Sequence, residues 1–152
     1  MLPTPKSYKL AAGAAEGKTL LNAFDNALLQ AGIGNVNLLR ISSILPPESV
    51  HVPDLVLPPG ALVPTAYGYL ISEERGATIA AAVGIGFGPS SFGVIMEHAA
   101  KGRAPQAEAA VRTMLENAFA ARGAALTNIM LASAEHTVVE IGCVFAGVAL
   151  WY

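Results

Sequence analysis

The sequence predicts an α/β fold of the αββα type, in which helices pack on layers of β-sheet within a single domain, residues 1–152. Two segments have the spacing of amphipathic helices, and about seven others have the composition of strands. Hydrophobic residues make up 53% of the chain and charged residues only 13%, against about 25% in an ordinary domain. This composition excludes disorder, and it predicts that other subunits cover part of the surface, because charges are depleted from interface cores.

Two helices are predicted, from about Thr19 to Ala31 and from about Pro105 to Arg122. Each has apolar residues at the spacing of one helix face, and each is followed by a glycine suited to a helix end. Thr19 suits the N-cap of the first helix, and Pro105 suits the first turn of the second. The predicted buried faces are Leu20, Phe24, Ala27, Leu28 and Ala31 in the first helix, and Ala107, Ala110, Val111, Met114, Ala118 and Phe119 in the second.

Strands are predicted over residues 7–14, 35–42, 62–72, 78–86, 92–98, 128–134 and 137–150. These segments are mostly apolar or alternate in polarity, and several are rich in β-branched residues. Residues 44–47 must be extended or turning, because a residue that precedes proline avoids the α region. The last segment is apolar on both faces, which predicts a central strand in a covered sheet.

The charge balance and the cysteine count exclude several classes of protein. The net charge is −2 and the pI about 5.9, so the chain lacks the basic surface that nucleic-acid binding requires. The apolar runs are too short for a membrane helix of about 20 residues, or they are interrupted by glycine and proline. The N-terminus has no signal-peptide pattern, and the single cysteine, Cys143, is expected to be a small buried hydrophobe. A cytoplasmic location is therefore expected.

Three further signals are interpreted as structural. The run Gly84–Gly88 lacks the third glycine of a nucleotide-binding loop and is expected to form a glycine-rich turn. A serine pair at Ser90 and Ser91 lies among glycine and proline and is expected to be a loop. Three scattered histidines lack metal-ligand spacing, so no metal is expected: His51, His98 and His136.

The segment from Gly32 to Pro47 is the most unusual stretch of the chain, and it contains the pair Ser42-Ser43. Alone, a serine pair at a strand end is typical of a polar turn. Here it is one of several blocks that follow in order: LNAFDNAL at 21–28, AGIG at 31–34, NVNL at 35–38, SSILPP at 42–47, PG at 59–60, AAAV at 80–83 and GVIME at 93–97. Together these blocks resemble the pyruvoyl-dependent arginine decarboxylase family over nearly the whole chain.

The resemblance implies self-cleavage between Ser42 and Ser43, which would give a β chain of residues 1–42 and an α chain of residues 43–152. The Ser43 hydroxyl would attack the carbonyl of Ser42 in an N-to-O acyl shift. Elimination and loss of ammonia would then convert residue 43 into a covalent pyruvoyl cofactor. Only a residue with a β-oxygen does this cleanly, so Ser43 could not be replaced by alanine. The pyruvoyl carbonyl would take up the electrons released with CO2 when L-arginine becomes agmatine.

The resemblance also implies roles for other side chains. Glu97 would donate the proton to the substrate carbon, and half-burial would raise its pKa toward a useful range. Asp25 would pair with the substrate guanidinium, and each site would lie between neighbouring subunits of a trimer. The remaining pocket residues implied by the resemblance are Leu28, Gly34, Val36, Asn37 and Ile44.

Several alternatives stay open. From the residues alone, Glu97 is an ordinary strand-end charge, Asp25 is a solvated helix residue, and Arg40 contacts a substrate carboxylate or is a surface charge. The substrate could be another amino acid, such as histidine or lysine, or the chain could be an unprocessed, non-catalytic oligomeric homologue. Whether trimers pair into hexamers is open. Glu48 departs from the family pattern, which favours a small residue such as glycine after Pro47.

Overall fold

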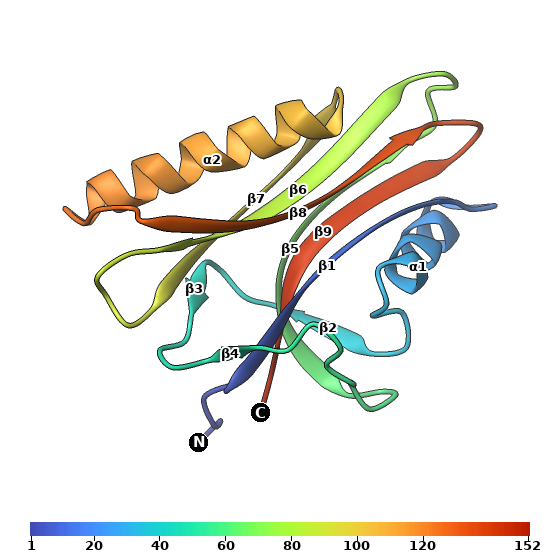
Figure 1. Cartoon of the computed structure of the whole chain (residues 1–152). Helices are drawn as coiled ribbons and strands as arrows, with labels where there is room; N and C mark the ends of the chain where they lie inside the picture. The colour runs from blue at the N-terminus through green and yellow to red at the C-terminus, as the bar shows by residue number, and fades with distance from the viewer.

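The computed structural model describes all 152 residues and places two facing β-sheets between two helices (Figure 1). The five-stranded sheet has the order β2-β5-β9-β1-β4, and the four-stranded sheet has the order β3-β7-β6-β8. The elements are β1 (Ser7–Glu16), α1 (Leu20–Gln30), β2 (Asn37–Arg40), β3 (Ile44–Leu45), β4 (Val50–His51), β5 (Leu62–Ser72), β6 (Thr78–Phe87), β7 (Gly93–Lys101), α2 (Ala104–Ala121), β8 (Asn128–Thr137) and β9 (Gly142–Trp151). The predicted αββα sandwich is thereby confirmed.

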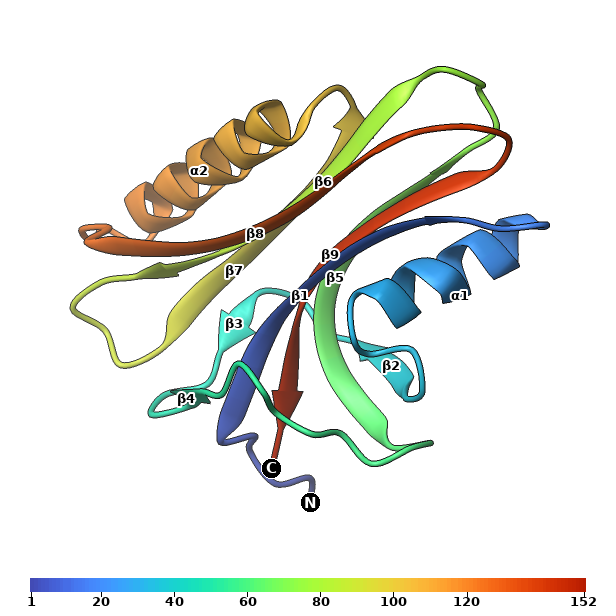
Figure 2. The same ribbon diagram turned by 45° about the vertical axis from the view of Figure 1, so that its right-hand side comes forward.

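Each helix covers the outer face of one sheet, which the turned view shows clearly (Figure 2). α1 packs on β1 and β9 of the five-stranded sheet, and α2 packs on β6, β7 and β8 of the other sheet. Between the sheets lies the largest core cluster, whose members include Ile79, Val83, Ile85, Ile95, Val144 and Val148. No helix of the chain is long and apolar enough to cross a bilayer.

The last strand occupies the centre of its sheet, as its two apolar faces predicted. β9 pairs antiparallel with β1 along ten residues and with β5 along eight. Its residues from Gly142 to Leu150 are all buried. Its predicted start was wrong, because β8 continues to Thr137 and residues 138–141 form the connection that crosses from one sheet to the other.

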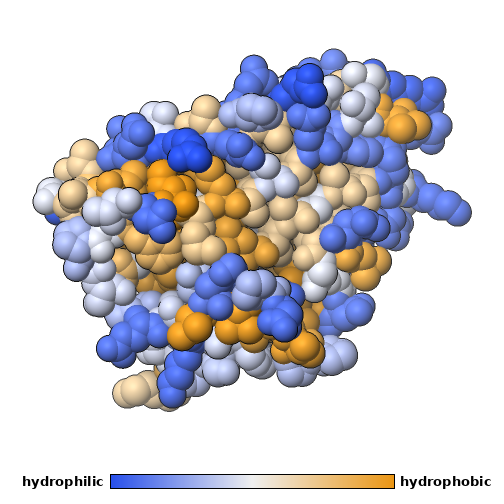
Figure 3. All heavy atoms as spheres, viewed as in Figure 1, coloured by the Kyte–Doolittle hydropathy of each residue, from blue (hydrophilic) through white to orange (hydrophobic).

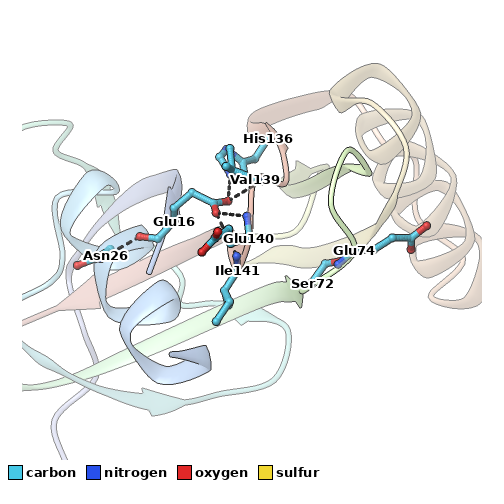
Figure 4. Close-up of polar contacts among 8 residues, drawn as sticks. All are labelled: Glu16, Asn26, Ser72, Glu74, His136, Val139, Glu140 and Ile141. Carbon is cyan, nitrogen blue, oxygen red and sulfur yellow. Dashed lines mark hydrogen bonds and ion pairs between the residues drawn. The ribbon is translucent and has the colours of Figure 1, made fainter. Parts of the chain in front are cut away.

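The N-terminal strand fixes this crossing through the carboxylate of Glu16, at the end of β1 (Figure 4). The carboxylate accepts hydrogen bonds from the backbone N–H groups of Val139 (3.2 Å), Glu140 (2.7 Å) and Ile141 (3.1 Å). Its Oε2 also lies 2.5 Å from His136 Nε2, on β8. Partial burial alone would raise the pKa of Glu16, but these hydrogen bonds outweigh it and lower the pKa to about 2.

Both helices lie where they were predicted, with their buried faces slightly rotated. Thr19 caps α1 by accepting a hydrogen bond from the Asn22 N–H at 3.1 Å. Leu20 is 49% exposed, contrary to prediction, because the first turn extends beyond the sheet while Ala23 packs beneath the helix. In α2, Leu115 is fully buried where Met114 was predicted, and Ala110 is only half-buried. A row at i, i+4, i+8 and i+11 from Ala107 faces the sheet.

The prediction of a glycine-rich turn is wrong for Gly84 and Gly86, which belong to β6 and allow close packing. Gly84 and Gly86 lie within the strand and are buried beneath α2. A Cβ added at Gly84 would lie 2.6 Å from Val111 Cγ1, so the absence of a side chain lets the helix approach closely. Ser90 and Ser91 lie in the exposed connection from β6 to β7, as predicted.

Candidate active site

The Ser42–Ser43 peptide lies where the chain passes from one sheet to the other. Before it, β2 pairs parallel with β5, and the Ile41 N–H still donates to Thr65 O at 3.1 Å. After it, β3 pairs antiparallel with β7, and Ser43 O accepts from the Ile95 N–H at 2.7 Å. Both sides of this peptide are therefore anchored, each to a different sheet. The predicted strand over 35–42 ends early for this reason.

Glu97 lies on the β7 face that points between the sheets, together with Ile95 and Ala99. It is half-buried against Gly68 of β5, where an added Cβ would approach Glu97 Cγ to 3.2 Å. Burial raises the pKa of this carboxyl, and the positive charge of Arg40 lowers it in part. The raised pKa agrees with the sequence-based expectation.

Ser43 and Glu97 belong to one site because of the register of β3 and β7. Leu45 is in the inter-sheet core, and Ser43, a half-buried residue just before β3, is two positions from it, from which we infer that its side chain faces the same way. The hydrogen bond to Ile95 puts Ser43 opposite that residue, and Glu97 follows two positions later on the same face. Ser43 and Glu97 are therefore diagonal neighbours across a strand pair, a separation of roughly 7–8 Å that is a short span for a bound substrate.

The predicted substrate-binding residues occupy other places. Asp25 is exposed on α1, whereas Leu28 is buried beneath that helix. Gly34 and Val36 line a groove of about 340 Å³ beside the loop at residues 55–57. Asn37 is the first residue of β2, and its amide donates to Gly60 O at 3.1 Å. Ile44 is the first residue of β3 and is 42% exposed.

One chain does not bring Asp25 together with Ser43 and Glu97. α1 packs on the outer face of the five-stranded sheet, and Glu97 lies on the opposite side, between the sheets. The sheet itself therefore separates the two carboxylates. A site that used both would need them from different copies of the chain.

Sequence reasoning missed Gly68 and left Arg40 undecided. A glycine inside an otherwise bulky strand, as in residues 66–71, is the signal that could have identified a close approach at Gly68. The Arg40 guanidinium donates to Tyr67 O at 2.8 Å and lies over the Tyr67 ring, 4.6 Å from its centroid. Cys143 is fully buried, as expected, and burial raises the pKa of its thiol to about 12.

Comparison with known proteins identifies the family of the chain. The family model described as pyruvoyl-dependent arginine decarboxylase matches residues 7–150. A protein of that name from Methanocaldococcus jannaschii is 53% identical over 97% of this chain and 91% of its own length. Namesakes from Methanococcus maripaludis and Pyrococcus horikoshii are each 46% identical, over 97% and 90% of this chain and 92% and 89% of their own lengths. The chain therefore belongs to the pyruvoyl-dependent arginine decarboxylase family.

Proposed function

We propose that this chain cleaves itself between Ser42 and Ser43 and then decarboxylates L-arginine to agmatine and CO2. The observation that carries the proposal is the register of a doubly anchored peptide, in which Ser43 is hydrogen-bonded opposite Ile95, two residues from Glu97. Family membership supports the same cofactor and substrate. The relatives' names also make arginine the first substrate to test, ahead of histidine and lysine.

The cleavage step follows from the atoms present. The Ser43 hydroxyl oxygen forms a bond to the Ser42 carbonyl carbon, and the Ser42–Ser43 C–N bond breaks to give an ester and a free amine. Elimination removes the α-proton of residue 43 and releases the Ser42 carboxylate, leaving an enamine. Water then replaces the nitrogen, which departs as ammonia, and a pyruvoyl group remains. The anchored strands on both sides hold the reacting groups close, which lowers the entropic part of the barrier.

The mature site combines that group with the chain's own side chains. When formed, the pyruvoyl carbonyl supplies an electron acceptor for the pair released with CO2. Glu97 holds a proton at its carboxyl, which its raised pKa favours, and donates it to the substrate carbon. Asp25 of a neighbouring copy pairs with the substrate guanidinium, because the two groups match bidentately.

An oligomer, with a trimer as the proposed form, completes this site. The separation of Asp25 from Glu97 by a sheet is one support, and the exposed apolar side chains are another. Figure 3 shows apolar residues grouped across one face of the chain. The large exposed hydrophobic residues include Leu20, Leu21, Leu29, Leu39, Ile44, Leu62 and Tyr69. The cytoplasmic location stays a prediction.

Intact-mass measurement under denaturing conditions tests the cleavage. We expect fragments of residues 1–42 and 43–152, the larger one lighter than its serine form by one ammonia. Ser43→Ala should give one uncleaved species, and the control Ser90→Ala should cleave as the parent does. A split after Ser90 would contradict the site assignment. A single species at full mass after prolonged incubation would favour the non-catalytic alternative.

Mixing two variants tests the shared site. Asp25→Asn is expected to raise KM for arginine sharply, and Glu97→Gln to lower kcat. If each site takes Asp25 and Glu97 from different copies, co-assembly of the two variants restores up to about one quarter of the sites. Activity no higher than the sum of the separate variants would show that the carboxylates do not meet across a subunit boundary.

A further inference from the structure

Arg40 occupies an edge that the cleavage segment leaves open. β2 pairs with β5 only as far as Arg40 and Thr65, and the chain then turns away toward Ser43. Beyond that point the edge of β5 has no neighbouring strand, and the Arg40 guanidinium donates to Tyr67 O at 2.8 Å. The same guanidinium lies 4.6 Å from the centroid of the Tyr67 ring. These two contacts hold a permanent positive charge at one place on the edge.

Glu97 reaches the next residue of the same strand. A Cβ added at Gly68 would lie 3.2 Å from Glu97 Cγ and 3.4 Å from its Cβ, so the side chain packs directly on that backbone. Arg40, at the open edge with the Tyr67 ring on the α1 side, and Glu97, on the inner face, therefore contact adjacent residues of β5. We propose that Arg40 is a positioning residue for the decarboxylation, and that its fixed charge limits how far burial favours the protonated form of Glu97. The inference rests on the proposed function, in which Glu97 donates a proton.

The surroundings of Glu97 leave Arg40 as the charge that acts on it. Other titratable side chains share the inward register: Tyr8 and Glu16 of β1, His51 of β4, Lys101 of β7 and His136 of β8. Burial raises the pKa of Tyr8, so its hydroxyl stays neutral at ordinary pH. His136 is paired with Glu16 and Lys101 with Glu74, four residues along β6 from the position of Glu97. The inward-facing residues nearest Glu97 are apolar, with Val83 on β6 opposite it and Leu45 on β3. Burial raises the pKa of Glu97, and Arg40 lowers it.

The sign of the effect gives a test that a purely structural role would not pass. A proton donor loses activity as pH rises through its pKa, which gives kcat/KM a falling alkaline limb. Arg40→Met removes the charge and keeps an unbranched side chain, so the limb should move to higher pH. Arg40→Lys keeps a charge and should leave the limb near its parental position. A variant that only loosened the fold would lower kcat/KM by one factor at every pH.

A second readout does not depend on activity. The carboxyl carbon of Glu97 is titrated by NMR in uncleaved Ser43→Ala protein labelled with ¹³C-glutamate, with Glu97→Gln used for assignment. We expect the midpoint to rise in Arg40→Met, and to rise in the Ser43→Ala parent when salt screens Arg40. The salt series keeps Arg40 in place and so needs no second substitution.

The outcomes separate the two proposals. If the midpoint shifts while no amino acid is decarboxylated, the influence of Arg40 on Glu97 holds and the proposed function fails. If arginine is decarboxylated while both the alkaline limb and the midpoint stay unchanged in Arg40→Met, the proposed function holds and the role of Arg40 is overturned.

Discussion

Glu48 is strained in this fold, and replacing it with glycine should stabilise the protein. It is the chain's one non-glycine residue with positive φ, at 62°. The residues 46–49 form a turn in which the Ser49 N–H donates to Pro46 O at 3.4 Å and the Ser49 hydroxyl donates to the same oxygen at 2.7 Å. Glu48 is the third residue of that turn, where type II turns require positive φ and favour glycine. The small residue that the resemblance predicts at this position thus has a conformational reason.

The magnitude follows from two opposing terms. An L-residue in the left-handed region costs about 1–2 kcal/mol, which glycine avoids. Glycine also makes the unfolded chain more flexible, which offsets about 0.4–1 kcal/mol of that gain. Glu48→Gly should therefore raise the free energy of unfolding by about 0.5–1 kcal/mol. For a chain of this size, that corresponds to a Tm increase of roughly 1–4 °C.

Denaturation of uncleaved protein measures this difference. The substitutions are made in the Ser43→Ala background, so that every sample is one intact chain at the same concentration. Glu48→Ala is the matched control, because it removes the carboxylate and keeps the strained backbone, so its Tm should stay near that of the parent. Equal Tm values for the glycine and alanine variants would refute the strain argument, and the gain would then belong to the lost charge.

Three other predictions follow from the structure. Glu16→Gln should destabilise the fold by about 2 kcal/mol near pH 7, because charged hydrogen bonds to the 138–141 connection are lost. The pKa of Glu16 is lowered to about 2 in the folded protein, so its stabilisation should be present above pH 4.5. Acid unfolding should show this contribution disappear as the pH falls toward 2. Gly68→Ala should displace Glu97 by a few tenths of an ångström, so the fall in kcat should be the main effect and the change in Tm the smaller one. An unchanged kcat would contradict the tight contact. Cys143 should resist alkylation at pH 8 in the folded protein and react after unfolding, as mass measurement would show.

The local elements were accessible from the sequence because their causes are local. Apolar spacing located both helices, and the cap at Thr19 depends on a side chain three residues from its partner N–H. The ends of elements were harder to predict where residues distant in the sequence determine them. β8 and β9 end and begin where they do because the connection between them changes sheets, and Glu16, more than a hundred residues earlier, holds that connection.

The candidate site was predictable in its residue types and not in its arrangement. The resemblance identified Ser43, Glu97 and Asp25 together, but a sheet separates Asp25 from the others in one chain. Arg40 was ambiguous because its position depends on where β2 leaves β5, which is a matter of strand pairing. Residues 40 and 97 are linked through β5, a strand that neither of them belongs to.

The position of the Ser42–Ser43 peptide reconciles self-cleavage with a stable fold. A break there would cut the only segment that joins β2 to β3, while β2 stays paired with β5 and β3 with β7. The fragment of residues 1–42 would also stay bound in the five-stranded sheet, because β1 lies between β9 and β4 and pairs with β9 along ten residues. Cleavage would therefore release one connection between the sheets without exposing the core. Freed from the peptide but still hydrogen-bonded to Ile95, residue 43 would keep its place beside Glu97.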